Sequence, residues 1–192
     1  MGLNALVASP VQSAAIQKPG HLNHPLTIAG VTGNELGRFA GLLAAIIKPG
    51  DCITLHGPLG AGKTTLTQFL AAALGVDAGQ YVSSPSFALL HEYSGILAIY
   101  HMDLYRLNDA IEVEEAGLLE YLDREGLVII EWPERLGSEL PENRLEIHLT
   151  PLEDGSREIV LRPHGPGWTA RAKELKNISL PGNLVTVSRS RA

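Results

Sequence analysis

The chain lacks the features that mark secreted, membrane-spanning or nucleic-acid-coating proteins. Its 192 residues include one cysteine, Cys52, so no internal disulfide can form. No apolar run approaches the roughly 18 residues of a spanning helix, and the N-terminus lacks the basic start and apolar stretch of a secretory signal. A net charge of −6 disfavours a protein that coats nucleic acid through its overall field. We therefore expect a cytoplasmic protein with no membrane contact.

Histidine is present, but without a recognisable ligand pattern. The seven histidines show none of the short, regular spacings typical of zinc sites. The sequence therefore predicts no transition-metal site.

A phosphate-binding loop is the strongest motif in the chain. Residues 57–64 follow the pattern of glycine, four residues, then Gly-Lys-Ser/Thr, between a predicted buried strand at 52–56 and a predicted helix at 65–74. The glycines let backbone N–H groups point at an anion, and the helix N-terminus adds partial positive charge. We expect Lys63 to reach the β- and γ-phosphates and the Thr64 hydroxyl to hold Mg²⁺. The predicted nucleotide ligands of this segment are Gly57, Leu59, Gly60, Ala61, Gly62, Lys63, Thr64 and Thr65.

Two further strands are predicted to end in a carboxylate. One apolar run, 96–102, leads into Asp103, and another, 127–130, leads into Glu131. In a parallel sheet such acids are delivered to the carboxyl edge, where nucleotides bind. Either acid could orient the water shell of the metal while the other positions the attacking water. For each, a helix N-cap after a strand is the alternative.

A helix is predicted just before the phosphate-loop strand. Thr32 and Glu35 form a capping box, and apolar residues follow at helical spacing. This helix is placed to flank an adenine ring, with Thr32 and Leu36 as candidate contacts. A core helix without a nucleotide contact is the alternative.

The segment 81–86 is rich in hydroxyl groups and precedes a predicted strand at 87–93. Ser84 and Ser86 are candidates for sensing the γ-phosphate and its metal, and an ordinary polar turn is the alternative.

Ser94 and Gly95 form a tight turn, so 87–93 and 96–102 are predicted to pair as a hairpin. A second hairpin is predicted between 144–150 and 157–162.

These elements predict an α/β fold: a single P-loop NTPase domain with a mixed sheet, a parallel core and antiparallel hairpins, flanked by helices. We expect residues 1–26 to form a flexible extension, 27–163 the ATPase domain, and 164–192 a mobile basic tail. An acidic helical region at 109–123 is either a solvated face or a surface for a basic partner.

Four segments together resemble the bacterial TsaE family, the P-loop ATPases of tRNA threonylcarbamoyladenosine biosynthesis. They are 57–65 (Gly-Pro-Leu-Gly-Ala-Gly-Lys-Thr-Thr), 83–87 (Ser-Ser-Pro-Ser-Phe), 101–107 (His-Met-Asp-Leu-Tyr-Arg-Leu) and 130–135 (Ile-Glu-Trp-Pro-Glu-Arg). The last two segments are more specific than the phosphate loop. The resemblance covers about residues 30–150 and says nothing about either tail.

The resemblance implies roles for individual residues. Glu131 resembles the metal-coordinating acid of the family, so Thr64 and Glu131 are the implied Mg²⁺ ligands. Asp103 resembles the catalytically required aspartate, as a base or as a partner behind the metal. The implied catalytic set is Asp103, Glu131 and Lys63. Trp132 resembles the functionally important tryptophan, and Ser86 stands where the family usually has threonine.

The resemblance also implies partners. These are the TsaB and TsaD homologues, with ATP and ADP as ligands and tRNA contacted indirectly through the complex. TsaE is needed for the carbamoyl-transfer cycle to turn over, and its own ATPase is weak without partners. Arg106 and Arg135 are the candidates for an arginine finger within the chain, and Arg135 is also a candidate nucleotide ligand.

Three other functions share the phosphate loop. A small-molecule kinase would carry an arginine-rich lid, whereas the region after Asp103 is acidic. A GTPase switch would carry an Asn-Lys-x-Asp motif, which is absent, so adenine is favoured. A nucleotide-gated assembly factor, in which binding matters and hydrolysis is incidental, is the third alternative.

Overall fold

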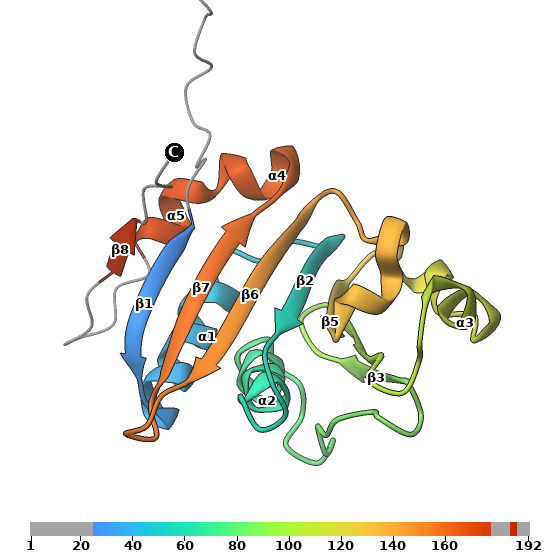
Figure 1. Ribbon diagram of the computed structural model, residues 1–192, viewed down its shortest axis with the longest axis horizontal. Coiled ribbons are helices and arrows are strands. Elements are labelled where there is room, and N and C mark those ends of the chain that lie inside the picture. The colour runs from blue at the N-terminus through green and yellow to red at the C-terminus, as the bar shows by residue number, and fades with distance from the viewer. Residues whose placement is uncertain (1–24, 178–184, 188–192) are drawn as a thin grey trace, which may run out of the picture.

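The computed structural model describes residues 25–177 and 185–187, and its centre is one eight-stranded sheet (Figure 1). The strand order is β3-β4-β5-β2-β6-β7-β1-β8. Adjacent strands from β4 to β6 run parallel, and the outer pairs β3–β4, β6–β7, β7–β1 and β1–β8 are antiparallel. This confirms the predicted mixed sheet. The strands are β1 Leu26–Val31, β2 Asp51–His56, β3 Leu90–Ser94, β4 Ala98–Asp103, β5 Leu127–Glu131, β6 Arg144–Pro151, β7 Arg157–Pro163 and β8 Val185–Val187.

Helices cover both faces of the sheet. On one face α1 and α2 pack over a core that includes Phe39, Leu66 and Ile147, all fully buried. On the other face α3 and the 3₁₀ segments pack over β4 and β5 around Met102, Val113 and Ile130. The helical elements are α1 Gly33–Ala44, α2 Lys63–Ala73, α3 Ala110–Glu115, η1 Leu119–Tyr121, η2 Pro133–Glu139, α4 Gly165–Ala170 and α5 Ala172–Lys176.

The capping box predicted the start of α1 correctly. The backbone N–H of Glu35 donates to the Thr32 hydroxyl, and the Glu35 carboxylate accepts from the Thr32 backbone N–H. These bonds satisfy N–H groups that a helix start otherwise leaves unpaired.

Both predicted hairpins are present, but the first has shifted boundaries, and its second strand begins at Ala98 rather than at residue 96. Strand β3 begins at Leu90 rather than at residue 87, because Leu89 has a φ of 65° that interrupts extended backbone. Phe87 therefore lies in a turn, 84% exposed. Strand β1, which pairs with β7, was not among the predicted elements.

The region after residue 163 differs from the expected mobile tail over the part that the structure describes. Trp168 in α4 is fully buried, and β8 pairs with β1. Arg171 donates to both carboxylate oxygens of Asp51, at 2.6 and 2.7 Å, and to the carbonyl of Ile46. A basic residue counted as part of a solvated tail thus ties the C-terminal helices to the start of β2. The expected extension at 1–26 lies almost entirely outside the described residues.

None of the helices in the described ranges combines the length and apolar character needed to cross a membrane.

Sheet topology brings the predicted acids together. Asp103 and Glu131 are register partners at the ends of the parallel strands β4 and β5, and Glu131 also pairs with Leu55 of β2. Because β2 leads directly into the phosphate loop, both carboxylates lie at the edge of the sheet where that loop begins.

Candidate functional site

The phosphate loop has backbone geometry that only glycine can supply at its two ends. Gly57 has a φ of 143°, and a Cβ there would lie 2.4 Å from the Leu149 carbonyl oxygen. Gly62, with a φ of 98°, is the N-cap of α2. The loop therefore leads directly into the N-terminus of α2, whose first N–H groups face the anion site.

Lys63 begins α2, and its side chain turns back over the loop. Its Nζ donates to the carbonyls of Gly57 and Pro58, at 2.9 and 3.1 Å, and lies 4.3 Å from the centre of a Trp132 ring. Burial lowers the pKa of Lys63, while the carboxylate of Glu131 opposes that shift. The ammonium group is thus held among carbonyl oxygens and an aromatic face, where a phosphate oxygen would be a stronger acceptor.

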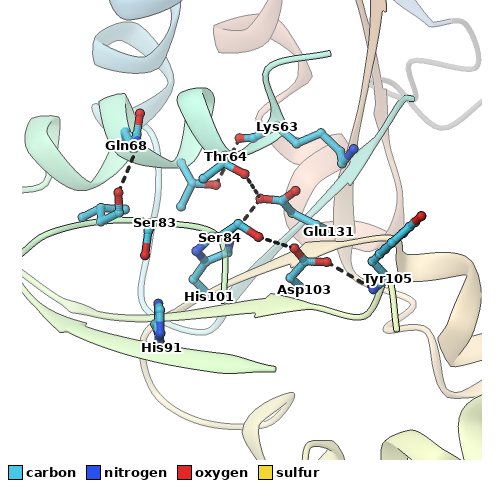
Figure 2. Close-up of polar contacts among 12 residues, drawn as sticks. Lys63, Thr64, Gln68, Ser83, Ser84, His91, His101, Asp103, Tyr105 and Glu131 are labelled. Carbon is cyan, nitrogen blue, oxygen red and sulfur yellow. Dashed lines mark hydrogen bonds and ion pairs between the residues drawn. The ribbon is translucent and has the colours of Figure 1, made fainter. Parts of the chain in front are cut away.

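Glu131 is the centre of a buried hydrogen-bond group (Figure 2). Its Oε1 accepts from the Thr64 hydroxyl at 2.8 Å and lies 3.0 Å from Nε2 of His101. His101 is fully buried, and its Nδ1 has no hydrogen-bond partner among the described residues. An ionised carboxylate accepts only, so Nε2 carries the proton in this contact.

His101 has a part in the site that the sequence alone did not assign. The signal available was its spacing: His101 and Asp103 are two residues apart on a strand, so their side chains share one face. What was missing was the register that puts β5 and Glu131 beside that face.

Asp103 is held by hydroxyl and backbone groups. Its Oδ2 accepts a short hydrogen bond from Oγ of Ser84, and its Oδ1 accepts from the backbone N–H of Tyr105 at 3.1 Å (Figure 2). Of the two serines predicted as sensors, Ser84 is the one bonded to this acid, while Ser86 lies on the cavity wall.

A cavity of about 340 Å³ joins these groups. Its walls include the phosphate loop, both acids, the serines and the aromatic side chains of Tyr105 and Trp132, whose rings lie 5.0 Å apart. Twelve residues that the sequence analysis singled out line it, namely Leu59, Gly60, Gly62, Lys63, Thr64, Thr65, Ser84, Ser86, Asp103, Arg106, Glu131 and Trp132.

The structure does not bring every predicted residue to this cavity. Leu36 is fully buried in the core under α1, and Thr32 is engaged in the capping box. Gly57 and Ala61 shape the loop without lining the cavity, and Ala61 is buried. Arg135 instead donates to the Asn108 carbonyl at 3.4 Å. The adenine contacts predicted from α1 thus remain predictions without support from the cavity.

The two arginines considered as fingers lie differently. Arg106 lines the cavity, and its guanidinium stacks on the exposed ring of Phe87 at 3.9 Å. Arg135 points toward α3. Of these two arginines, Arg106 shares the cavity wall with both acids and Arg135 does not.

The residues present fit a magnesium nucleotide. The Thr64 hydroxyl and the Glu131 and Asp103 carboxylates offer the hard oxygen ligands that Mg²⁺ prefers. The loop offers backbone N–H groups and an ammonium for phosphate. A side chain at Gly57 would clash with the Leu149 carbonyl, and the φ of 98° at Gly62 favours glycine.

Comparison with known proteins agrees with this geometry. The family model described as "Threonylcarbamoyl adenosine biosynthesis protein TsaE" matches residues 32–159, which span the phosphate loop, both acids, the β3–β4 hairpin and strand β6. The chain belongs to the TsaE family. This confirms the family membership that the four sequence segments predicted.

Two relatives and one solved structure show how much of the chain is similar to known proteins. The tRNA threonylcarbamoyladenosine biosynthesis protein TsaE of Bacillus subtilis is 41% identical over 146 residues, covering 76% of this chain and 90% of the relative. The protein of the same name from Treponema pallidum is 38% identical over 130 residues, covering 68% and 95%. The crystal structure of Bacillus subtilis YdiB superposes with a TM-score of 0.67 at 36% identity, covering 80% of this chain and 95% of that one.

Proposed function

We propose that this TsaE-family chain is the Mg²⁺-dependent ATPase component of the machinery that makes threonylcarbamoyladenosine in tRNA. In this proposal it acts in the cytoplasm with TsaB and TsaD homologues, and its hydrolysis of ATP permits the carbamoyl-transfer complex to turn over. Contact with tRNA is indirect, through the complex. The names of the relatives support the pathway, and the site supports the chemistry.

One observation carries the hydrolytic assignment. Thr64 of the phosphate loop donates to Glu131 at the end of β5, and Asp103 is the register partner of Glu131 on β4. A phosphate loop that only bound nucleotide would need the loop and its lysine. Two carboxylates at the same sheet edge additionally supply a metal ligand and a group for the attacking water.

In the proposed reaction each residue of the site would have its own role. Thr64 and Glu131 would hold Mg²⁺, which when bound neutralises charge on the phosphate oxygens. Lys63 would exchange its two loop carbonyls for phosphate oxygens. Asp103 would orient the attacking water or accept its proton, so that the bond from the γ-phosphorus to the bridging oxygen breaks and ADP and phosphate leave. His101 would keep the Glu131 carboxylate in position.

Several features favour completion of the site by partners. The rim carries large exposed apolar side chains: Leu59 is 78% exposed, Phe87 84% and Tyr105 48%. Among the residues that the structure describes, Arg106 is the one arginine on the cavity wall, and it is stacked on Phe87. A surface that covered Phe87 would also reposition Arg106, so hydrolysis would be slow alone and faster with partners.

The decisive measurement is phosphate release by the purified chain, alone and with the cognate TsaB and TsaD homologues. We expect stimulation by the partners that Asp103→Ala and Glu131→Ala both abolish. Full turnover by the isolated chain, with no increase on adding the partners, would contradict the partner-dependent mechanism. Transfer of the γ-phosphate to an added small acceptor instead of water would favour the kinase.

The assembly-factor alternative requires a separate comparison. Lys63→Ala is expected to weaken ATP binding, whereas Glu131→Ala is expected to bind ATP and fail in hydrolysis. If Glu131→Ala binds ATP and still supports many modification cycles, hydrolysis is incidental and the proposed role is wrong.

A further inference from the structure

A second polar cluster lies on the sheet, apart from the acids of the nucleotide cavity. Its members are His56, the last residue of β2, and Glu146 and His148 of β6. The potential ligand atoms of these three side chains all lie within 4.8 Å of one another. Neither His56, Glu146 nor His148 lines the nucleotide cavity.

The sheet register explains why these side chains meet. His56 and His148 are direct partners on adjacent parallel strands, and their rings stack with centroids 4.3 Å apart. Glu146 is two residues before His148 on the same strand, so it projects from the same face. Residues 145, 147 and 149 face the opposite side and join the core under α1 and α2. In Figure 1 the outward side of β6 and β7 faces the viewer, with no described helix in front of it.

From this arrangement we propose that His56, Glu146 and His148 form a binding site for a transition-metal ion of the Zn²⁺ class. Two imidazole nitrogens and one carboxylate oxygen, with water in the fourth position, are a common zinc ligand set. The hard oxygen ligands proposed for Mg²⁺ belong to a different class. This inference does not depend on the proposed ATPase function.

Binding of an ion would displace a proton from His148. Its Nε2 lies 3.4 Å from Oε2 of Glu146 and is the donor in this contact, since an ionised carboxylate only accepts. The same nitrogen ligates a metal only without its proton, so zinc binding is expected to release a proton and to weaken as the pH falls.

The carboxylate is oriented by a neighbour, as metal-binding carboxylates commonly are. Arg144 donates to Oε1 of Glu146 from Nε and Nη2, at 3.2 and 2.6 Å, which leaves Oε2 on the side of His148. Nε2 of His164 lies 3.2 Å from the same Oε1, so this oxygen is engaged by two neighbouring side chains.

Three contacts must break when an ion binds. One is the 3.4 Å contact between Nε2 of His148 and Oε2 of Glu146. Nη1 of Arg162 lies 3.3 Å from Nε2 of His148, and the Thr54 hydroxyl lies 3.2 Å from Nε2 of His56. The stacked rings must also rotate, since ligands of tetrahedral zinc lie about 3.4 Å apart with their lone pairs converging. The His148 side chain is 29% exposed and that of His164 is 37% exposed, so there is room for rotation and a path for the ion.

Calorimetric titration of the full-length, tag-free chain with Zn²⁺ tests the site, with Mg²⁺ in excess to occupy the oxygen ligands near the phosphate loop. We expect one ion per chain with a micromolar dissociation constant. His56→Gln and His148→Gln should each weaken binding by more than the roughly 10- to 100-fold that loss of a supporting group costs. Substituting Co²⁺ should give the visible absorption of a four-coordinate site, and His148→Gln should remove it.

Matched controls separate this site from other histidines. His91→Gln on β3, and the double variant His21→Gln/His24→Gln near the N-terminus, should bind Zn²⁺ like the unaltered chain. Arg162→Ala should bind about tenfold more tightly, because a competing cation is removed from His148. Because a misfolded variant would lose affinity, a folding defect cannot imitate this expected increase in zinc affinity.

Three results would overturn the proposal. The first is that the unaltered chain does not bind zinc below about 100 micromolar. The second is that a histidine control loses zinc binding while His148→Gln keeps it, and the third is that Glu131→Gln loses zinc binding, which would place the ion in the nucleotide cavity.

Discussion

Thr64 donates a 2.8 Å hydrogen bond to Glu131 across 67 positions of sequence. The bond joins the first turn of α2 to the end of β5, so the phosphate loop and the acidic strand are positioned relative to one another by a direct contact. The same Oε1 lies 3.0 Å from Nε2 of His101, which makes Glu131 the meeting point of three elements.

Glu131→Gln is expected to reduce ATP hydrolysis by about 10²- to 10³-fold while ATP binding persists, because an amide cannot replace a carboxylate beside the metal. Single-turnover phosphate release and nucleotide titration measure the two effects separately. The exposed Glu125, which precedes the opposite end of β5, provides the control: Glu125→Gln should behave like the unaltered chain. Equal losses in both variants would remove Glu131 from its proposed role.

His101→Phe is expected to lower kcat by about 10- to 100-fold and to raise the Mg²⁺ concentration needed for half-maximal activity, because the Glu131 carboxylate loses its orienting donor. A merely structural effect would not shift the Mg²⁺ dependence. The comparison variant is His91→Phe, on β3 outside the group around Glu131. An unchanged Mg²⁺ dependence in His101→Phe would show that His101 does not act through the metal ligand.

Arg171→Met is expected to lower the free energy of unfolding by about 3 to 5 kcal/mol, since it leaves the Asp51 carboxylate buried without its partner. Urea denaturation followed by circular dichroism measures this loss. Arg124→Met removes an exposed ion pair with Glu120, separated by 3.8 Å, and should cost about 0 to 1 kcal/mol. A small effect at Arg171 would mean that the C-terminal helices contribute little to the domain.

His56 is expected to make the protein less stable in acid. Its pKa is lowered to about 4 from an ordinary 6.5, so the unfolded chain binds this proton more tightly. The stability due to the neutral ring is therefore complete above about pH 6.5 and is lost as the pH falls toward 4. We expect the unaltered chain to lose about 1 to 2 kcal/mol more than His56→Gln over this range, a value reduced for solvent screening.

Unfolding in urea at several pH values, without added metal, measures this difference. His91→Gln should keep the full pH dependence of the unaltered chain. Parallel stability curves for His56→Gln and the unaltered chain would show that burial does not hold His56 in its neutral form.

Local sequence patterns predicted the helices and strands whose own residues mark where they begin or end. The capping box at Thr32 marked the start of α1, and the apolar runs before Asp103 and Glu131 marked β4 and β5. The same patterns failed where the deciding contact is distant. Trp168 and Arg171 belong to a segment rich in Pro, Gly and basic residues. The burial of Trp168 and the contact of Arg171 with Asp51 show that part of this segment is packed.

By itself the sequence determined the phosphate loop, the two acid-ended strands and the family, because each is recognised from short segments of consecutive residues. The tertiary structure alone decided that His101 joins Glu131, that Leu36 is buried away from the cavity, and that His56 meets Glu146 and His148. These relationships depend on strand register and order. Side chains on neighbouring strands become adjacent only when the sheet has paired, and no local period specifies which strand will be the neighbour.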